Sequence, residues 1–207
     1  ADLVHVGAGR EDVHDQLAKV EQTRLDENGA GHTQTRLFAR NILGLVTSET
    51  HPETGLTTYA SFTALGHPQT TTAGGVPVST VYDALDRVIS TSASGQLYVQ
   101  NTWDGASGTG GGAVKGRLTR RLGFNPGASE NAQVEESFTY LGLGGRLSKK
   151  TVALRRGTAG SPLVQAFDQN FTWNPLGLLA SRTAPAPVGS SAGAVEFRYS
   201  AGYPTRI

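Results

Sequence analysis

Apolar and polar residues alternate along several stretches of this chain. The alternation is clearest in 163–173, 195–199 and 97–103, where large apolar side chains take every second position for most of the stretch. A period of two over such lengths is typical of a half-buried β-strand and not of a helix. The pattern therefore predicts many short strands.

One segment near the start fits a helical spacing instead. Val13, Leu17 and Val20 recur at intervals of four and three residues, with acidic residues ahead of them. This spacing would place the three side chains on one face of a helix. An irregular pair of strands explains the same residues equally well, so residues 1–22 are expected to form an irregular lead-in that is either a short helix or a strand pair.

A short motif recurs between the alternating stretches: an aromatic residue, Asp or Asn, two further residues, Gly, then often Arg and an apolar residue. Residues 82–88 are the fullest copy, with Asp86 at the glycine position. Degenerate copies occupy 25–29, 40–46, 62–68, 140–147, 173–179 and 199–202, and a split copy has its halves at 103–105 and 116–119. The motif residues of these copies are Asp26, Gly29, Asn41, Gly44, Phe62, Gly66, Tyr82, Asp83, Arg87, Trp103, Asp104, Gly116, Arg117, Tyr140, Gly144, Arg146, Trp173, Asn174, Gly177, Tyr199 and Gly202.

Each residue type in the motif has a mechanical role in a β-hairpin. The Asp or Asn side chain accepts a hydrogen bond from the backbone two residues on and starts a turn. Gly supplies the positive φ that a tight hairpin needs. A single hairpin cannot bury its own face, so successive copies must stack. The sequence thus predicts an all-β array of hairpins over 23–207, forming a long, curved, spiralling antiparallel sheet with loop inserts at 105–115 and 183–194.

Composition supports this fold and excludes several classes of protein. Gly makes up 27 of 207 residues, which suits many turns. The formal net charge of +1 gives no overall field that would favour nucleic acid or an anionic membrane. The absence of Cys excludes a disulfide scaffold and a thiolate metal site. No apolar run approaches the ~18 residues of a membrane span.

The repeated motif resembles the YD-repeat, or rearrangement-hotspot (Rhs), family over roughly residues 20–207. That family includes bacterial polymorphic toxins, shell subunits of insecticidal toxin complexes and the animal teneurins. The resemblance implies repeats that spiral into a hollow shell, a secreted or cell-surface bacterial protein, and two kinds of partner: the remaining shell repeats, of the same or a companion polypeptide, and an enclosed cargo or toxin domain. The family's Asp-Pro self-cleavage signature has no match here. We therefore expect an interior stretch of shell from a longer polypeptide, without a toxin or protease.

Other candidate chemistry is weak. Residues 189–193 fit the G-x-S-x-G nucleophile pattern, but no His follows them in the chain. The glycine-rich run 108–116 lacks the Gly-Lys-Ser/Thr ending of a phosphate-binding loop. The five His residues have no metal-ligand spacing. We expect no catalytic, cofactor-binding or metal residues and no cofactor. The alternative to a shell segment is a surface adhesin or carbohydrate- or protein-binding module that uses the loops 105–115 and 183–194.

Overall fold

The computed structural model describes residues 4–6, 10–11, 16–25, 30–105, 114–126, 133–142, 144–156 and 163–206. Every regular element in these residues is a β-strand, which confirms the all-β prediction. The chain divides into two compact units, 1–88 with 92–95 and 89–91 with 96–207. The expected repeat residues Asp26 and Gly29, and most of the insert 105–115, lie outside the described residues.

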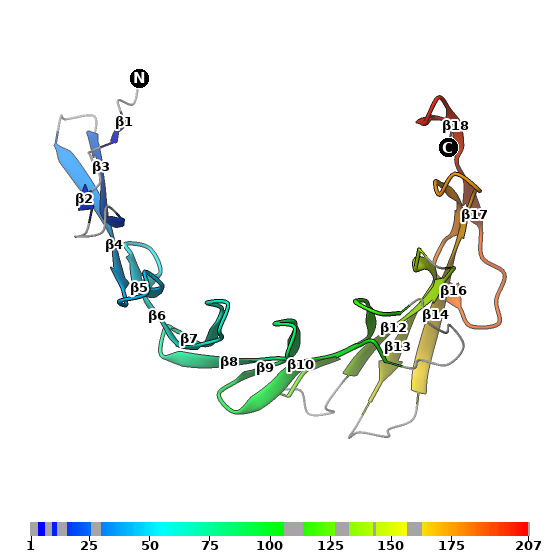
Figure 1. Ribbon diagram of the computed structural model, residues 1–207, viewed down its shortest axis with the longest axis horizontal. Helices are drawn as coiled ribbons and strands as arrows, with labels where there is room; N and C mark the ends of the chain where they lie inside the picture. The colour runs from blue at the N-terminus through cyan, green and yellow to red at the C-terminus, as the bar shows by residue number, and fades with distance from the viewer. Residues whose placement is uncertain are drawn as a thin grey trace. The chain divides into compact units, whose positions relative to one another are not determined.

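The first unit is a series of antiparallel hairpins in chain order (Figure 1). Its strands are β1 (Val4–Val6), β2 (Arg10–Glu11), β3 (Leu17–Leu25), β4 (Gly31–Arg40), β5 (Val46–His51), β6 (Gly55–Phe62), β7 (Pro68–Ala73) and β8 (Val76–Tyr82), followed by β9 (Val88–Ala93), which both units share. From β3 to β8 each strand pairs with the next.

The described residues of the lead-in, 4–6, 10–11 and 16–22, contain strands and no helix. Leu17 and Val20 lie in β3, and β1 and β2 both pair with that strand. Val13, the first residue of the helical spacing, lies outside the described residues. β3 pairs along most of its length with β4, from Lys19 opposite Leu37 to Leu25 opposite Gly31. This ladder satisfies the backbone of β3, so the four-and-three spacing of its apolar residues does not decide the structure.

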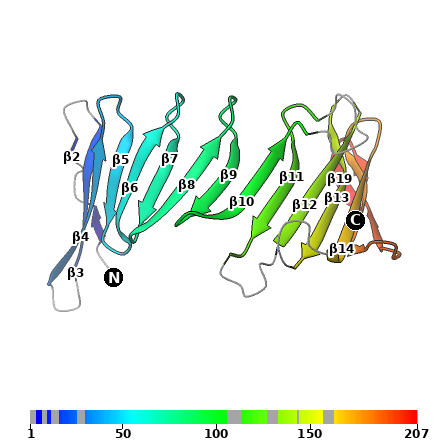
Figure 2. The same ribbon diagram turned by 90° about the horizontal axis from the view of Figure 1, so that it is seen from below.

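The second unit repeats the same arrangement (Figure 2). Its strands are β10 (Gln96–Trp103), β11 (Leu118–Phe124), β12 (Gln133–Leu141), β13 (Arg146–Arg155), β14 (Leu163–Trp173), β15 (Leu179–Thr183), β16 (Ala186–Pro187), β17 (Ala194–Glu196), β18 (Arg198–Ser200) and β19 (Tyr203–Arg206). The expected loop insert 183–194 is partly built into the sheet, because β16 pairs with β14 and β17 pairs with β15.

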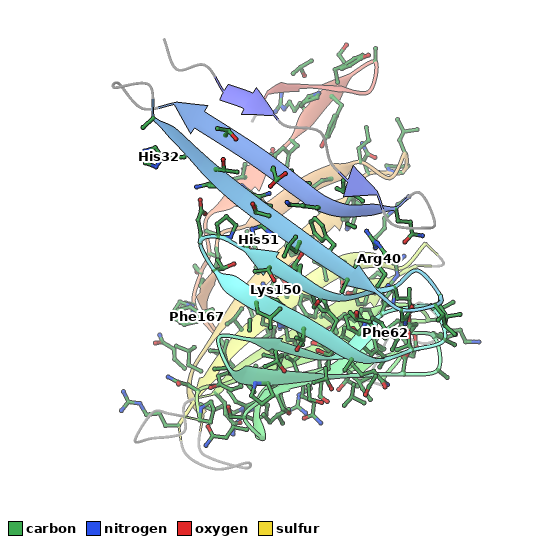
Figure 3. The ribbon with its side chains drawn as sticks, turned by 90° about the vertical axis from the view of Figure 1, so that its left-hand side faces the viewer. His32, Arg40, His51, Phe62, Lys150 and Phe167 are labelled. Carbon is green, nitrogen blue, oxygen red and sulfur yellow. The ribbon has the colours of Figure 1, made fainter. Side chains whose placement is uncertain are left out.

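Each unit is one layer thick. Among the described residues only Leu122, Ala153, Thr119, Gln133 and Gly145 are buried. The solvent-accessible surface of the chain is 13635 Å², whereas a compact monomer of this mass would expose about 9,200 Å². Side chains project from both sides of the strands (Figure 3). The fold therefore depends on strand pairing and on contacts between neighbouring strands, and not on a central core.

Cross-strand ion pairs stabilise one face of the second unit. Glu135 lies on β12 between two Arg residues, with Oε1 2.7 Å from Arg120 Nε and Oε2 3.0 Å from Arg155 Nε. The hydrogen bond from Arg120, with that from Arg155, holds the pKa of Glu135 below its usual value. On the same face, Asp168 Oδ2 is 2.8 Å from Lys149 Nζ. These opposite charges are diagonal neighbours on adjacent strands, since Glu135 lies opposite Leu122 and Ala153, and such pairs favour the observed strand register.

Candidate functional site: the turn edge of the repeats

The repeated motif builds one type of turn, which we call the motif turn. It occupies residues 41–45, 63–67, 83–87 and 174–178. In each, the first amide donates to the carbonyl of the fifth residue, and the fourth amide donates back to the first carbonyl. For 83–87 these N···O distances are both 2.9 Å. The motif predicted from sequence thus corresponds to a closed, doubly hydrogen-bonded turn.

The side chain of the first residue in the motif turn accepts hydrogen bonds from backbone amides of the same turn. Asn41 Oδ1 accepts from the amides of Leu43 and Leu45, each at 3.0 Å. Asp83 Oδ1 accepts in the same way from the amides of Leu85 and Arg87. These bonds satisfy amides that the turn would otherwise leave without a partner.

Asp83 makes one further contact with its own turn. Its Oδ2 accepts from Arg87 Nε at 2.8 Å and lies 2.6 Å from Arg87 Nη2. The side-chain hydrogen bond from Arg87 lowers the pKa of Asp83. The Asp and Arg positions of the fullest copy are therefore brought together, and both contribute to the same turn.

Thr63 occupies the Asp/Asn position in its copy, a role that the sequence analysis missed. Its Oγ1 accepts from the amide of His67 at 3.2 Å, and its own amide donates to the His67 carbonyl at 2.9 Å. Phe62 before it and Gly66 three residues after it were the available signals. A hydroxyl can replace the carboxylate because only one acceptor is needed.

The fourth residue of the motif turn has a left-handed backbone. The φ angles are +77° at Gly44, +88° at Gly66 and +83° at Gly177. Asp86 takes this conformation too, with φ of +61°. Gly removes the steric cost of this region, and Asp is one of the residues that tolerate it. The substitution in the fullest copy therefore keeps the turn geometry.

The split copy closes across its insert. The amide of Asp104 donates to the Arg117 carbonyl at 3.1 Å, and Asp104 Oδ1 accepts from the amide of Gly116. Trp103 pairs with Leu118 across the two strands. Residues 103–105 and 116–119 are thus brought together as the two halves of one turn.

Two other copies differ from the expected positions. In the copy at 140–147 the turn runs from Gly142 to Gly145, whose φ is +55°, while Gly144 has no left-handed φ. One extra cross-strand pair, Leu141 opposite Arg146, accounts for the shift. The copy at 199–202 becomes a tight hairpin between β18 and β19, with φ of +48° at Ala201 and +84° at Gly202.

The aromatic residue of a copy is anchored to the preceding hairpin. Tyr82 Oη donates to the Pro68 carbonyl at 3.2 Å, and Tyr140 Oη donates to the Leu118 carbonyl at 2.7 Å. Trp173 Nε1 donates to the Leu147 carbonyl at 2.8 Å. In all three cases the acceptor lies two residues after the left-handed position of the preceding turn. Desolvation raises the pKa of Tyr82 and of Tyr140. In these three copies the aromatic therefore joins its hairpin to the one before it.

The fifth residue of a turn reaches the next turn. A Cβ on Gly66 would lie 2.9 Å from Leu45 Cδ2, and a Cβ on Gly177 would overlap the Arg146 guanidinium. Arg117 Nη2 donates to the Gly144 carbonyl at 2.7 Å. Gly66 and Gly177 are thus required by close approach as well as by φ.

Where Asp86 replaces glycine, the fifth residue of the preceding turn is His67. The Nδ1 atom of His67 hydrogen-bonds to the Asp86 carboxylate. The His67 ring also stacks on Tyr82, with centroids 5.9 Å apart and planes at 19°. The turn edge of each unit is therefore a ladder in which neighbouring turns touch through defined side chains.

Residues 189–193, which fit the G-x-S-x-G pattern, do not lie between a strand and a helix as a nucleophile elbow requires. Gly189 lies in a turn with φ of +86°, and the described chain after Gly193 continues as the strand β17 and not as a helix. Within the described residues no group of three or more His, Asp or Glu side chains gathers as a metal site.

In the part of the chain that the structure describes, no helix is long and apolar enough to cross a bilayer.

No protein-family model matches the sequence, and no curated protein matches it. Among solved structures, a Photorhabdus luminescens Tc holotoxin pore with a mutated TccC3 matches at 12% identity and a TM-score of 0.45. A TcdB2-TccC3-Cdc42 structure matches at 14% identity and 0.41, and TcdB2-TccC3 without its hypervariable C-terminal region matches at 12% and 0.43. In each case the match covers 95% of this chain and 12% of the solved chain.

Proposed function

We propose that this chain is a segment of a YD-repeat β-shell, and that it acts as a wall around a cargo or toxin polypeptide. The observation that carries the proposal is the ladder of contacts between successive motif turns. Tyr82, Tyr140 and Trp173 each bind the backbone of the preceding hairpin. Hairpins joined in this way extend a continuous sheet one layer thick.

The chemistry of the sheet suits enclosure better than catalysis. Its contacts serve the turns and the strand register, as in the ion pairs of Arg120 and Arg155 with Glu135. Its faces carry many small hydroxyl residues, for example Thr58, Thr70 and Thr72 on neighbouring strands β6 and β7. Such a surface can contact an unfolded chain without binding it tightly, because it offers few broad apolar patches.

The remaining partners are part of the same proposal and rest on the resemblance of the motif. End strands carry unpaired backbone groups that associate with other chains unless they are covered. We propose that further repeats, of the same polypeptide or of a companion, pair with these strands. A secreted or cell-surface bacterial location is part of the same proposal and rests on the resemblance of the motif.

The deciding experiment is electron microscopy of the native particle that carries this chain, at a resolution that reveals an internal cavity. A closed shell with density inside is the expected result. A solid rod or an open sheet would refute enclosure. That result would favour the adhesin alternative, with the loops 105–115 and 183–194 as the place to search for a ligand.

A further inference from the structure

The net charge of +1 conceals opposite charges on the two units. The first unit contains six Lys or Arg residues and eleven Asp or Glu residues, which gives a formal charge of −5. The second unit contains twelve Lys or Arg residues and six Asp or Glu residues, which gives +6. An excess of this size on one unit attracts polyanions, although the charge of the whole chain does not indicate it.

One face of the second unit combines cations with aromatic rings. The strands β11, β12, β13 and β14 lie side by side (Figure 2). Directly opposed residues of neighbouring strands share a face, as do residues two apart in one strand. By this rule the register of β11 to β15 gathers a set of side chains that we call the phenylalanine face: Arg121, Glu136, Phe138, Lys150, Phe167, Phe171 and Arg182.

The cations of the phenylalanine face lie beside its rings. Lys150 Nζ is 5.7 Å from the centroid of the Phe138 ring, and Arg182 Cζ is 5.9 Å from that of Phe197. Lys150 Nζ is also 2.6 Å from Glu136 Oε1. Because Glu136 is the one carboxylate of the face as defined, Arg121 and the Arg182 guanidinium leave an excess of positive charge. Both Arg residues are exposed.

The rings of the phenylalanine face are only half-buried. The described sheet is one layer thick, so Phe138, Phe167 and Phe171 each keep an accessible part. On the other face of the same strands the cations have polar neighbours instead. There Arg120 lies opposite Ser137, and Lys149 lies between Thr139 and Asn170. The two faces therefore differ in the aromatic rings around their cations.

We propose that the phenylalanine face binds single-stranded nucleic acid, with phosphates on Arg121, Lys150 and Arg182 and with bases stacked on the accessible parts of the phenylalanine rings. Any polyanion could use the cations, but planar bases also gain from stacking on aromatic side chains. A β-sheet that carries aromatic rings among cations is a known platform for unstacked bases. A duplex cannot use the rings, because its bases are already stacked on one another.

The proposal goes beyond the wall function and does not depend on it. Fluorescence anisotropy of a labelled oligothymidylate of about 20 nucleotides, titrated with the full chain, measures the affinity. Three phosphate contacts on a single strand predict that binding weakens roughly 20-fold between about 50 and 200 mM salt. Binding with this salt dependence is the expected result.

Variants separate the rings from the charges. F167L keeps an apolar side chain without the ring, and it is expected to weaken binding at least about fivefold while leaving the salt dependence unchanged. R121Q/R182Q is expected to weaken binding and to reduce the slope of log affinity against log salt by about 1.4. The matched control R120Q/K149Q removes the same charge from the other face and is expected to change the affinity less than about twofold. Circular dichroism verifies that all three variants keep their strands.

Several outcomes would overturn the inference. One is the absence of binding at about 100 μM chain in about 50 mM salt. Another is a loss in R120Q/K149Q as large as that in R121Q/R182Q, which would assign the effect to net charge alone. Polyglutamate that binds as tightly as the oligothymidylate would indicate an acidic polypeptide partner, and tighter binding to phosphatidylserine vesicles would indicate a membrane. None of these results bears on whether the native particle has a cavity, so the two proposals can fail separately.

Discussion

Replacing Asn41 with Ala tests whether the first side chain of the motif turn holds the turn together. Asn41 Oδ1 accepts from the amides of Leu43 and Leu45, each at 3.0 Å. The Leu43 amide is exposed, so water replaces its lost partner at little cost. The Leu45 amide is part-buried and would lose a hydrogen bond that contributes about 0.5–1.5 kcal/mol.

The loss of the turn-forming side chain adds to this cost. Exchanging a capping Asn for Ala typically costs about 1 kcal/mol, part of which is the hydrogen bond itself. We therefore expect N41A to reduce the free energy that holds this turn closed by about 1–2 kcal/mol. This corresponds to a five- to thirtyfold rise in the open population. N41D keeps the acceptor oxygen and is expected to stay within about 0.5 kcal/mol of wild type.

Native-state hydrogen exchange measures the effect at the turn itself. The Leu45 amide should exchange five to thirty times faster in N41A than in wild type, and amides in β12 and β13 of the second unit should not change. Unchanged exchange at Leu45 would refute the role of the side chain. Equal acceleration in N41D and N41A would show that the acceptor oxygen is not what matters.

Two further predictions concern contact between turns and ionisation. G66A should destabilise the first unit more than G55A, because both glycines have φ near +80° but only a Cβ at Gly66 meets another side chain, Leu45; thermal denaturation of the two variants measures the difference. The hydrogen bond to Glu49 raises the pKa of Tyr59 to about 12, so the folded state holds this proton more tightly than the unfolded chain. Stability should accordingly be constant below pH ~10 and fall as the pH rises towards 12, measured by denaturant unfolding at each pH.

Each of these predictions has a matched control. Adding L45A to G66A should recover the extra loss relative to G55A, and no recovery would mean that the contact between turns is not the cause. Y59F removes one ionisable group, so its stability should fall less than that of wild type between pH 10 and 12, and the remaining fall comes from Tyr82 and Tyr140, whose pKa burial also raises. A fall of equal size in Y59F would assign the effect to another group.

The local turn structure was predictable from sequence because its determinants are adjacent in the chain. Asn41, Asp83 and Asn174 each precede their left-handed residue by three positions, and a side-chain acceptor at that distance is sufficient to nucleate the turn. The all-β class followed from the period of two. Thr63 was missed because threonine is common in strands and does not mark a turn by itself.

Features that depend on neighbouring hairpins could not be read in this way. Three glycines lie between 142 and 145, and the choice of Gly145 over Gly144 depends on the pairing of Leu141 with Arg146. The same limit applies to Leu17 and Val20, whose helical spacing is overruled by strand pairing, of Leu17 with Glu11 and of Val20 with Arg36. The contact between Arg146 and Gly177 requires knowing which turn follows which in space.

The ladder between turns has a consequence for how repeats can be exchanged by recombination. A crossover between two copies separates the fifth residue of one turn from the fourth residue of the next. Arg146 lies where a Cβ on Gly177 would stand, so a newly joined copy with any other residue there must displace the guanidinium. His67 instead faces the carboxylate of Asp86. We therefore expect recombined chains to fold best when whole blocks are exchanged that keep these matched neighbours together.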